Sequence, residues 1–430
     1  MSRPAFGPLA GRQFRLLWLA ATTSAAGSAF VPVAMAFAVL RVGGNATSLG
    51  IVLLVGIVAG LASYQAAGVW ADRLSRRNLM LTADLVRLAV EAGVAALLLT
   101  GQARIWELAL ATAIVSIGTA FEGPAAVSLV PEVVPTDKLQ QANSLLSMSV
   151  SGSSVLGPAV SGIMVAAAGP GWAFALDAAS FAGSAAFLMR MSSAGRPQAS
   201  HEHFLADLAT GWREVISRNW AWSTLIGNAV SNMAFAVFEV LGPVLAVRRL
   251  GGASGWGVVS SGIMAGELLA GLVTMWYRSR RPVSFGMATS VLLAAPLLAL
   301  AARQPMAIVT AGAVVGVCGG MILNNNWDTA IQQLVPNDVL ARFRSYDYLL
   351  AFVAIPVGYA VAGPLQSAFG ADTVLFGAGA TIAAANFVPA VLPAARAVVR
   401  QKDGTITGPP PRRKVPNVSK SATEAPAVSD

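Results

Sequence analysis

The sequence is poor in the residues from which metal sites and enzyme active sites are usually built. Its 430 residues include one cysteine, Cys318, and two histidines, His201 and His203. A single cysteine excludes an intrachain disulfide and a thiolate metal cluster, and two histidines in one polar segment argue against a histidine-ligated metal. The motifs G-x-S-x-G, H-E-x-x-H and G-x-x-x-x-G-K-S/T are also missing. We therefore expect that the protein binds no cofactor, is not an enzyme and is not an ATP-driven pump.

Charged residues are scarce as well. Only 11% of the chain is charged, 55% is hydrophobic, and the mean hydropathy is +0.65. Soluble domains carry about a quarter charged residues, so this chain lacks the polar coat of a water-exposed protein. Charge-free runs such as 16–40, 42–71 and 139–176 exceed the roughly 20 apolar residues that cross a bilayer. The sequence predicts an all-α polytopic membrane protein.

Twelve transmembrane helices account for these runs. We place them at 15–40, 46–71, 79–100, 105–128, 142–168, 172–190, 220–246, 254–277, 282–302, 305–330, 345–367 and 371–394. The predicted domains are therefore two six-helix halves, 1–190 and 220–395, joined by a polar cytoplasmic loop at 191–219. The Pro-, Lys- and Arg-rich stretch at 396–430 is expected to be a disordered cytoplasmic tail.

The basic residues are distributed unevenly between the two sides of the predicted membrane. Twenty-three lysines and arginines fall on the side of the N-terminus and five on the other. The positive-inside rule then places both termini in the cytoplasm and predicts a multi-pass protein of a plasma membrane of the bacterial inner-membrane type. The net charge of +9 follows from this topology and from attraction to anionic lipid, so we expect no nucleic-acid partner. We expect a monomer.

The two halves repeat each other. SLVPEVVPTDKLQQANS at 128–144 aligns with TAIQQLVPNDVLARFRS at 329–345 at a constant offset of 201. The offset pairs Pro135 with Pro336, Gly157 with Gly358, Gly162 with Gly363, and Gly169 with Gly370. Two parallel six-helix repeats form an architecture in which the substrate lies between the halves.

A dense group of charges follows the second predicted span, in GVWADRLSRRN at 68–78. It resembles the G-x-x-x-D-R-x-x-R-R/K motif of the major facilitator superfamily of secondary transporters, with Ser75 replacing the usual glycine. The matching residues are Gly68, Asp72, Arg73, Arg76 and Arg77. The resemblance implies a cytoplasmic gate whose ion pairs form in one state and break in the other. A plain positive-inside anchor is the alternative interpretation, and the second-half counterpart, MWYRSRR at 275–281, has no acid.

A second motif indicates which branch of the superfamily the chain resembles. SSVLGPAVSG at 153–162 resembles the antiporter motif G-x-x-x-G-P-x-x-G-G, with serines replacing two glycines. Gly157, Pro158 and Gly162 remain, and small residues at helical spacing allow close helix packing. In the superfamily this motif accompanies export. ADLVRL at 83–88 and WDTAIQQLVP at 327–336 resemble the branch of macrolide-efflux proteins and enterobactin-type exporters.

Acids within the predicted spans require an explanation, because each costs on the order of 3 kcal/mol to insert. Asp84, Arg87 and Glu91 share one face of the third span, and we expect them to form a structural ion pair near the gate, the alternative being a proton site. Isolated acids are candidates for proton coupling or substrate binding, the alternative being a carboxyl paired with a distant helix or reaching the interface. These acids are Glu122, Glu239, Glu267 and Asp328.

The leading functional prediction is a secondary active transporter that exports hydrophobic or amphipathic small molecules in exchange for protons, by alternating access. A nutrient or siderophore importer on the same fold is one alternative. A non-transporting membrane receptor or scaffold is another, although it would have no need of isolated membrane acids. The substrate itself is not readable from the sequence.

Overall fold

The computed structural model describes residues 7–71, 75–192 and 216–410, and nearly all of them are helical. The first bundle consists of η1 (Gly7–Ala10), α1 (Arg12–Ser28), α2 (Val31–Arg41), α3 (Ala46–Ala71), α4 (Arg76–Leu99), α5 (Ile105–Val133), η2 (Thr136–Lys138), α6 (Leu139–Ala168) and α7 (Pro170–Met189). The second consists of α9 (Asn219–Arg249), α10 (Gly252–Trp276), α11 (Pro282–Ser290), η3 (Val291–Leu293), α12 (Ala294–Ala301), α13 (Met306–Leu334), α14 (Asn337–Val353), α15 (Ile355–Phe369), α16 (Ala371–Val391) and α17 (Pro393–Arg396). A short ribbon of β1 (Val399–Arg400) and β2 (Ile406–Thr407) follows.

The predicted all-α membrane fold is confirmed. Eleven helical segments of the described residues are long and apolar enough to cross a membrane, with α1 and α2 forming one of them. The twelfth predicted span is α4, a 24-residue helix that is less apolar because it carries five charged residues. It packs between α5 and α7 inside the first bundle, which places it among the membrane helices.

The internal repeat appears in the backbone as well as in the sequence. Gly169 and Gly370 both join two helices at positive φ, 90° and 79°, a conformation that favours glycine. Pro135 and Pro336 have nearly the same dihedral angles, with φ of −58° and −57° and ψ of 145° and 144°. Positions 201 residues apart therefore have the same structural role.

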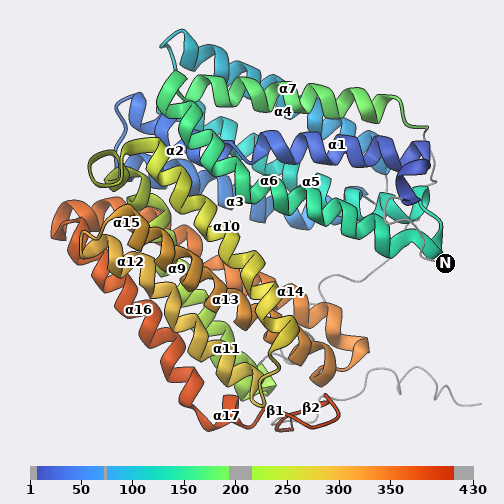
Figure 1. Cartoon of the computed structure of the whole chain (residues 1–430), viewed down its shortest axis with the longest axis vertical. Coiled ribbons are helices and arrows are strands. Elements are labelled where there is room, and N and C mark those ends of the chain that lie inside the picture. Colours follow the sequence, from blue (N-terminus) through green and yellow to red (C-terminus); the bar gives the residue numbers. More distant parts are fainter. Residues whose placement is uncertain (1–6, 72–74, 193–215, 411–430) are drawn as a thin grey trace, which may run out of the picture.

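The two bundles meet at one end and diverge towards the other (Figure 1). They converge around α2, α15 and the turn between α9 and α10, which we call the closed end. They separate towards the N-terminus and α17, which we call the open end. Two helix crossings hold the closed end together, α6 against α10 and α3 against α15.

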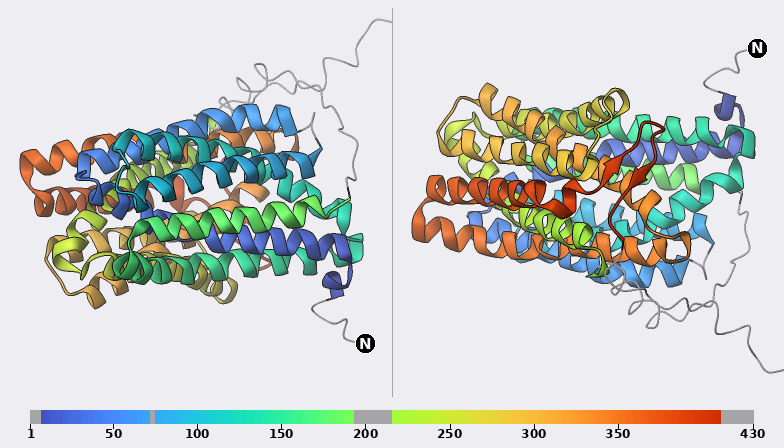
Figure 2. Two further views of the ribbon diagram at one scale, coloured as in Figure 1. Left: turned by 90° about the horizontal axis from the view of Figure 1, so that it is seen from above. Right: turned by 90° about the horizontal axis from the view of Figure 1, so that it is seen from below.

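The segment after α17 differs from the prediction. Residues 396–410 were expected to be disordered, but Val398 and Ile406 are buried against the ends of α9, α13 and α14. The Ile406 amide donates to Gln333 Oε1 at 2.7 Å, and the Arg400 amide donates to the Arg280 carbonyl at 2.8 Å. Figure 2 (right) shows the ribbon lying across the helix ends. Composition alone missed this ordered part of the tail, and residues 411–430 lie outside the described range.

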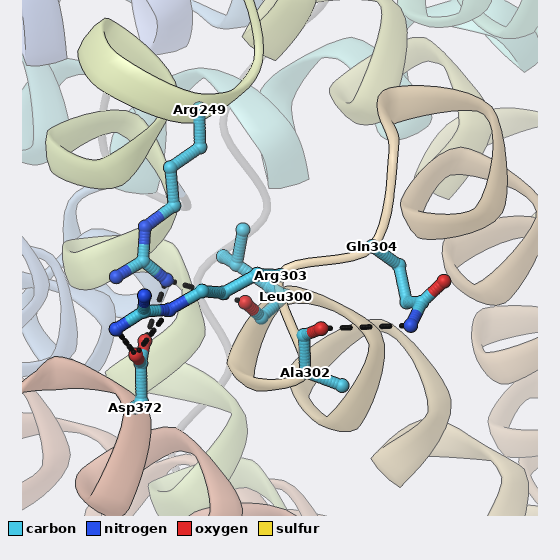
Figure 3. A network of polar contacts seen from close by, with 6 residues as sticks. All are labelled: Arg249, Leu300, Ala302, Arg303, Gln304 and Asp372. Atoms are coloured by element: carbon cyan, nitrogen blue, oxygen red, sulfur yellow. Dashed lines mark hydrogen bonds and ion pairs between the residues drawn. The ribbon is translucent and has the colours of Figure 1, made fainter.

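Two arginines and one carboxylate tie the second bundle together at the closed end (Figure 3). Asp372, at the start of α16, accepts from Arg249 Nη1 at 2.5 Å. It also accepts from Arg303 Nε and Nη2 at 2.9 and 2.8 Å. Because Arg249 ends α9 and Arg303 lies in the turn between α12 and α13, one carboxylate connects three elements.

Asp372→Asn should lower the melting temperature in detergent by a few degrees, because the ion pairs with two arginines are lost. Since the side chain is 30% exposed, we expect a loss of about 1 kcal/mol. Asp403→Asn is the matched control, because the side-chain hydrogen bonds of Asp403 stay within its own turn. Equal melting temperatures for the two variants would contradict the bridging role.

Candidate functional site

A buried polar cluster lies inside the first bundle, where α4 packs against α5 and α7. The cluster begins with the acid–base–acid face of α4. Asp84, Arg87 and Glu91 are only 1%, 3% and 1% exposed. They project from α4 into the interior of the bundle, so any charge they carry must be balanced locally.

Arg87 forms its ion pair with Glu122 of α5, across the helix interface. The guanidinium also lies over the ring of Phe181 of α7, 5.3 Å from its centroid. Gly118, one turn before Glu122, makes room for it, because a Cβ there would stand 2.9 Å from Arg87 Nε. Glu122, expected from its own helix to have no basic neighbour, is therefore paired with a distant one.

The predicted ion pair within α4 is wrong. Among the described residues, Arg87 makes no ion pair with Asp84 or Glu91, because its side chain extends sideways to α5. Asp84 instead accepts from Ser184 Oγ of α7 at 2.6 Å. The cluster also lies about three turns along α4 from Arg76, too far to be part of the gate motif.

Asp177 of α7 completes the cluster, and the sequence analysis did not single it out. It is 1% exposed and accepts from Ser180 Oγ at 3.1 Å and from Ser28 Oγ at 3.3 Å. Its signal in the sequence is an acid in the middle of an otherwise charge-free span, LDAASF at 176–181. Asp177 and Arg87 both lie within electrostatic reach of Glu91.

The cluster holds more acid than base. Its four carboxyl groups, from Asp84, Glu91, Glu122 and Asp177, surround one guanidinium among the residues that the structure describes. One oxygen each of Asp84, Glu91 and Asp177 is buried without a hydrogen-bond partner. Two donors of Arg87, Nε and Nη2, are buried without a partner as well. A carboxylate oxygen with no hydrogen-bond donor is poorly stabilised, whereas a protonated carboxyl has one O–H that can donate to a neighbouring acceptor. The arrangement is therefore suited to holding and releasing protons.

The other candidate acids lie in the second bundle and are not brought together with this cluster. Glu239 of α9 accepts from the Tyr359 hydroxyl of α15 at 2.6 Å. The Tyr359 carbonyl lies against Gly50 of α3, so this bond is at the contact between the two bundles. Glu267 of α10 is exposed, and no hydrogen bond or ion pair is recorded for it within the described ranges.

Asp328 is not isolated either. It pairs with Arg344 of α14, which also reaches Asp347 Oδ2 at 3.4 Å. Asp347 further accepts from Trp327 Nε1 at 2.9 Å. These contacts tie α13 to α14 near the open end, and they leave Asp328 with a counter-ion that its own helix does not supply.

The gate motif is described only in part. Arg76 pairs with Glu132 of α5 and donates to the Ser128 carbonyl at 2.8 Å. Arg77 donates to the carbonyls of Leu188 and Met189 at 2.7 and 2.8 Å, where a cation stabilises the C-terminus of α7. Asp72 and Arg73 lie outside the described residues, as do the surroundings of Gly68, so the latch remains a prediction.

The antiporter motif lies at the closed end, where α6 contacts other helices most closely. A Cβ on Gly157 would collide with Ala29, in the break between α1 and α2. A Cβ on Gly162 would collide with the Ala253 carbonyl of α10, and one on Gly257 would collide with the carbonyl of Pro158. Glycines on both helices thus allow the two bundles to touch backbone to backbone.

Comparison with solved structures identifies this fold. A bacterial homologue of the iron transporter ferroportin, in its inward-facing state, superposes with a TM-score of 0.71 at 15% identity, over 89% of this chain and 99% of that chain. A bacterial homologue of the human lysosomal transporter Spinster gives a TM-score of 0.63 at 15% identity, over 91% and 98% of the two chains. The fold is that of the major facilitator transporters.

Residues 3–409 match the transmembrane secretion effector family, and the chain belongs to that family. It is 27% identical to the multidrug efflux pump Tap of Mycolicibacterium fortuitum over 373 residues, 83% of this chain and 89% of the pump. It is 24% identical to macrolide efflux protein A of Streptococcus pyogenes over 268 residues, 60% of this chain and 66% of that protein. The recognition made from the sequence motifs is confirmed.

Proposed function

We propose that the protein is a proton-coupled exporter of hydrophobic or amphipathic small molecules. Export is supported by its similarity to two proteins named as efflux pumps and by the antiporter motif in α6. Coupling to protons is supported above all by one observation, the surplus of buried carboxyl groups around Arg87. The proposed site of coupling is therefore the cluster of Asp84, Arg87, Glu91, Glu122 and Asp177.

The physical argument for coupling starts from charge balance. Arg87 neutralises one carboxylate, and each further anion at membrane depth costs on the order of 3 kcal/mol. Some of the remaining carboxyl groups therefore hold protons in this state. A rearrangement that wets the cluster or moves Arg87 would release them, so proton binding and conformation are linked.

Contacts link this cluster to the crossing between the bundles. Asp177 accepts from Ser28, the last residue of α1, and the next residue, Ala29, packs on Gly157 of the antiporter motif. Ser161 of the same helix donates to the Phe30 carbonyl at 2.7 Å. A change at Asp177 therefore acts on the break between α1 and α2, and through it on α6. This chain of contacts is a route for coupling whose operation the variants below test.

The topology fits export, which the similarity to efflux proteins and the antiporter motif support. The positive-inside bias puts the open end, with the N-terminus and α17, in the cytoplasm. The structure then corresponds to a state that takes substrate from the cytoplasm. Protons entering from the outside would discharge into the cytoplasm as the drug leaves.

Reconstitution into liposomes tests the proposal. With the cytoplasmic face outward and an acidic interior, wild-type protein should accumulate members of a panel of ethidium, tetraphenylphosphonium and a macrolide. Glu122→Gln, Glu91→Gln and Asp177→Asn should each lose at least tenfold in gradient-driven accumulation while still binding the probe, because the amide keeps size and hydrogen bonding but does not titrate.

Glu107→Gln is the matched control, because Glu107 also lies on α5 but only caps the start of that helix. If the cluster variants accumulate the probe normally while Glu239→Gln or Glu267→Gln does not, coupling resides in the second bundle. If the probe accumulates only when the exterior is acidic, substrate and protons move in the same direction. The protein would then be an importer. If accumulation of the probe does not depend on the proton gradient in either direction, transport is not coupled to protons.

A further inference from the structure

A polar pocket of about 380 Å³ opens on the second bundle near the open end. It lies between the last turns of α10 and α13, and the ribbon of β1 and β2 contributes Arg400 and Gly404 to its wall. Thr274, Asn325, Asn326, Thr329 and Gln333 contribute polar groups from the two helices. The pocket is distinct from the Arg87 cluster, which lies in the other bundle.

The charge in this pocket is entirely positive. Arg278, after the end of α10, and Arg400 of β1 both line it, and none of its lining residues is acidic. Neither arginine has a carboxylate partner within the part of the chain that the structure describes, and Arg400 Nε is buried without a hydrogen-bond partner. Burial and the neighbouring charge of Arg278 hold the pKa of Arg400 below its ordinary value. Two guanidinium groups that line one pocket without a carboxylate favour the binding of an anion.

The strand that carries Arg400 is held in place by hydrogen bonds and by packing, whereas Arg278 is exposed. The amide of Arg400 is bonded to the Arg280 carbonyl, and the neighbouring strand is anchored through Ile406 to Gln333 of α13. Val398 is fully buried beside them. Fixed donors lose little conformational freedom on binding, which favours a defined ligand over a diffuse ion atmosphere.

The pocket lies at the depth of lipid headgroups. Trp276 and Tyr277, next to Arg278 at the end of α10, are 85% and 54% exposed. Exposed tryptophan and tyrosine at the end of a membrane helix are typical of the belt at the membrane–water interface. Met275, 63% exposed, lines the pocket beside them. An acyl chain could lie along this apolar surface while its headgroup enters the pocket.

We propose that this pocket binds the phosphate group of an anionic phospholipid, with Arg278 and Arg400 as its ligands. Arginine is suited to this role because its planar fork donates two parallel hydrogen bonds to phosphate oxygens. The side-chain amides of Asn325 and Gln333 would form hydrogen bonds with the hydroxyl groups of the headgroup. A bound lipid would hold the C-terminal ribbon against α10 and α13.

Native mass spectrometry of the full-length protein in neutral detergent tests the assignment. Three probes are titrated separately: a short-chain phosphatidylglycerol, phosphatidylcholine with the same chains, and inorganic phosphate. Wild-type protein should bind phosphatidylglycerol at least tenfold more tightly than either of the others. Arg278→Gln and Arg400→Gln should each weaken that binding by roughly five- to tenfold and leave phosphatidylcholine unchanged.

Arg280→Gln is the matched control, because it removes one charge from the same basic segment without lining the pocket. Its affinity for phosphatidylglycerol should stay within about twofold of wild type. An equal loss in this control would show that binding depends on general surface charge and not on the pocket. Equal affinity for inorganic phosphate would overturn the lipid assignment, and unchanged binding in an Arg278→Gln/Arg400→Gln double variant would overturn the site itself.

Discussion

Replacing Arg87 with methionine is expected to abolish gradient-driven transport, with a loss of at least a hundredfold. The variant keeps an unbranched apolar side chain and removes the guanidinium, and with it the contact with the Phe181 ring. Glu122 then loses its ion-pair partner in an apolar interior, and no other cation is available to the cluster among the described residues. Breaking a buried pair on one side costs about 3–5 kcal/mol, so the melting temperature should fall as well.

The double variant Arg87→Met/Glu122→Gln separates folding from coupling. Removing both partners leaves no unpaired ion, so much of the lost thermal stability should return. Gradient-driven transport should not return, because the group that links protonation to the position of α5 is gone. Recovery of both stability and transport would show that the pair only holds α4 to α5.

Arg87→Lys provides the graded comparison. A lysine keeps the charge but not the fork, and it reaches less far over the Phe181 ring. We expect it to retain the fold and a reduced rate of transport, with a shifted dependence on pH because the cluster is balanced less well. Measuring transport against pH for wild type and Arg87→Lys checks this, and superimposable profiles would count against a role in proton coupling.

The membrane fold was predictable because its signals are local or periodic. Apolar runs set the spans, and the constant offset of 201 paired Gly169 with Gly370, which have the same conformation in the structure. The contacts of Gly157 and Gly162 also match their interpretation as packing positions. In each case the information lies in the residue itself or in its spacing, and neither depends on which helix happens to be the neighbour.

The pairing of charges was not predictable in this way. Arg87 shares a helical face with Asp84 and Glu91, yet its partner lies 35 residues away on α5. Asp328 likewise finds Arg344 on the next helix. Spacing along one helix says which groups are near each other, but the direction of a long side chain is decided by the space that a neighbour leaves, here at Gly118.

Two further features had a signal that composition concealed. Asp177 is an acid in an apolar span and meets the same criterion as Glu122. In the tail, Asp403 and Gly404 form a dipeptide that favours a tight turn, and Gly404 has a φ of 89°. The many prolines and basic residues further along led the whole tail to be assigned as disordered.

Gly162→Leu is expected to prevent the closed end from forming and so to stop the transport cycle. A Cβ at this position would overlap the Ala253 carbonyl and stand 3.0 Å from the Gly257 Cα. The obstacle is backbone on both sides, so no side-chain rotation relieves it, and the two bundles must separate at the α6–α10 crossing. We expect transport to fall at least a hundredfold, with the protein still inserted and folded.

Accessibility to a membrane-impermeant maleimide measures the separation. The reporter is Ser261→Cys on α10, whose hydroxyl accepts from the Ala159 amide of α6 at 3.0 Å, in a background in which Cys318 is replaced by serine. Gly162→Leu should raise labelling from the outer side several-fold. Gly152→Leu, on the same helix but with nothing described within 4 Å of its Cβ, should leave labelling and transport near wild type. If Gly162→Leu behaves like Gly152→Leu, the glycine crossing is a packing detail rather than the outer closure of the transporter.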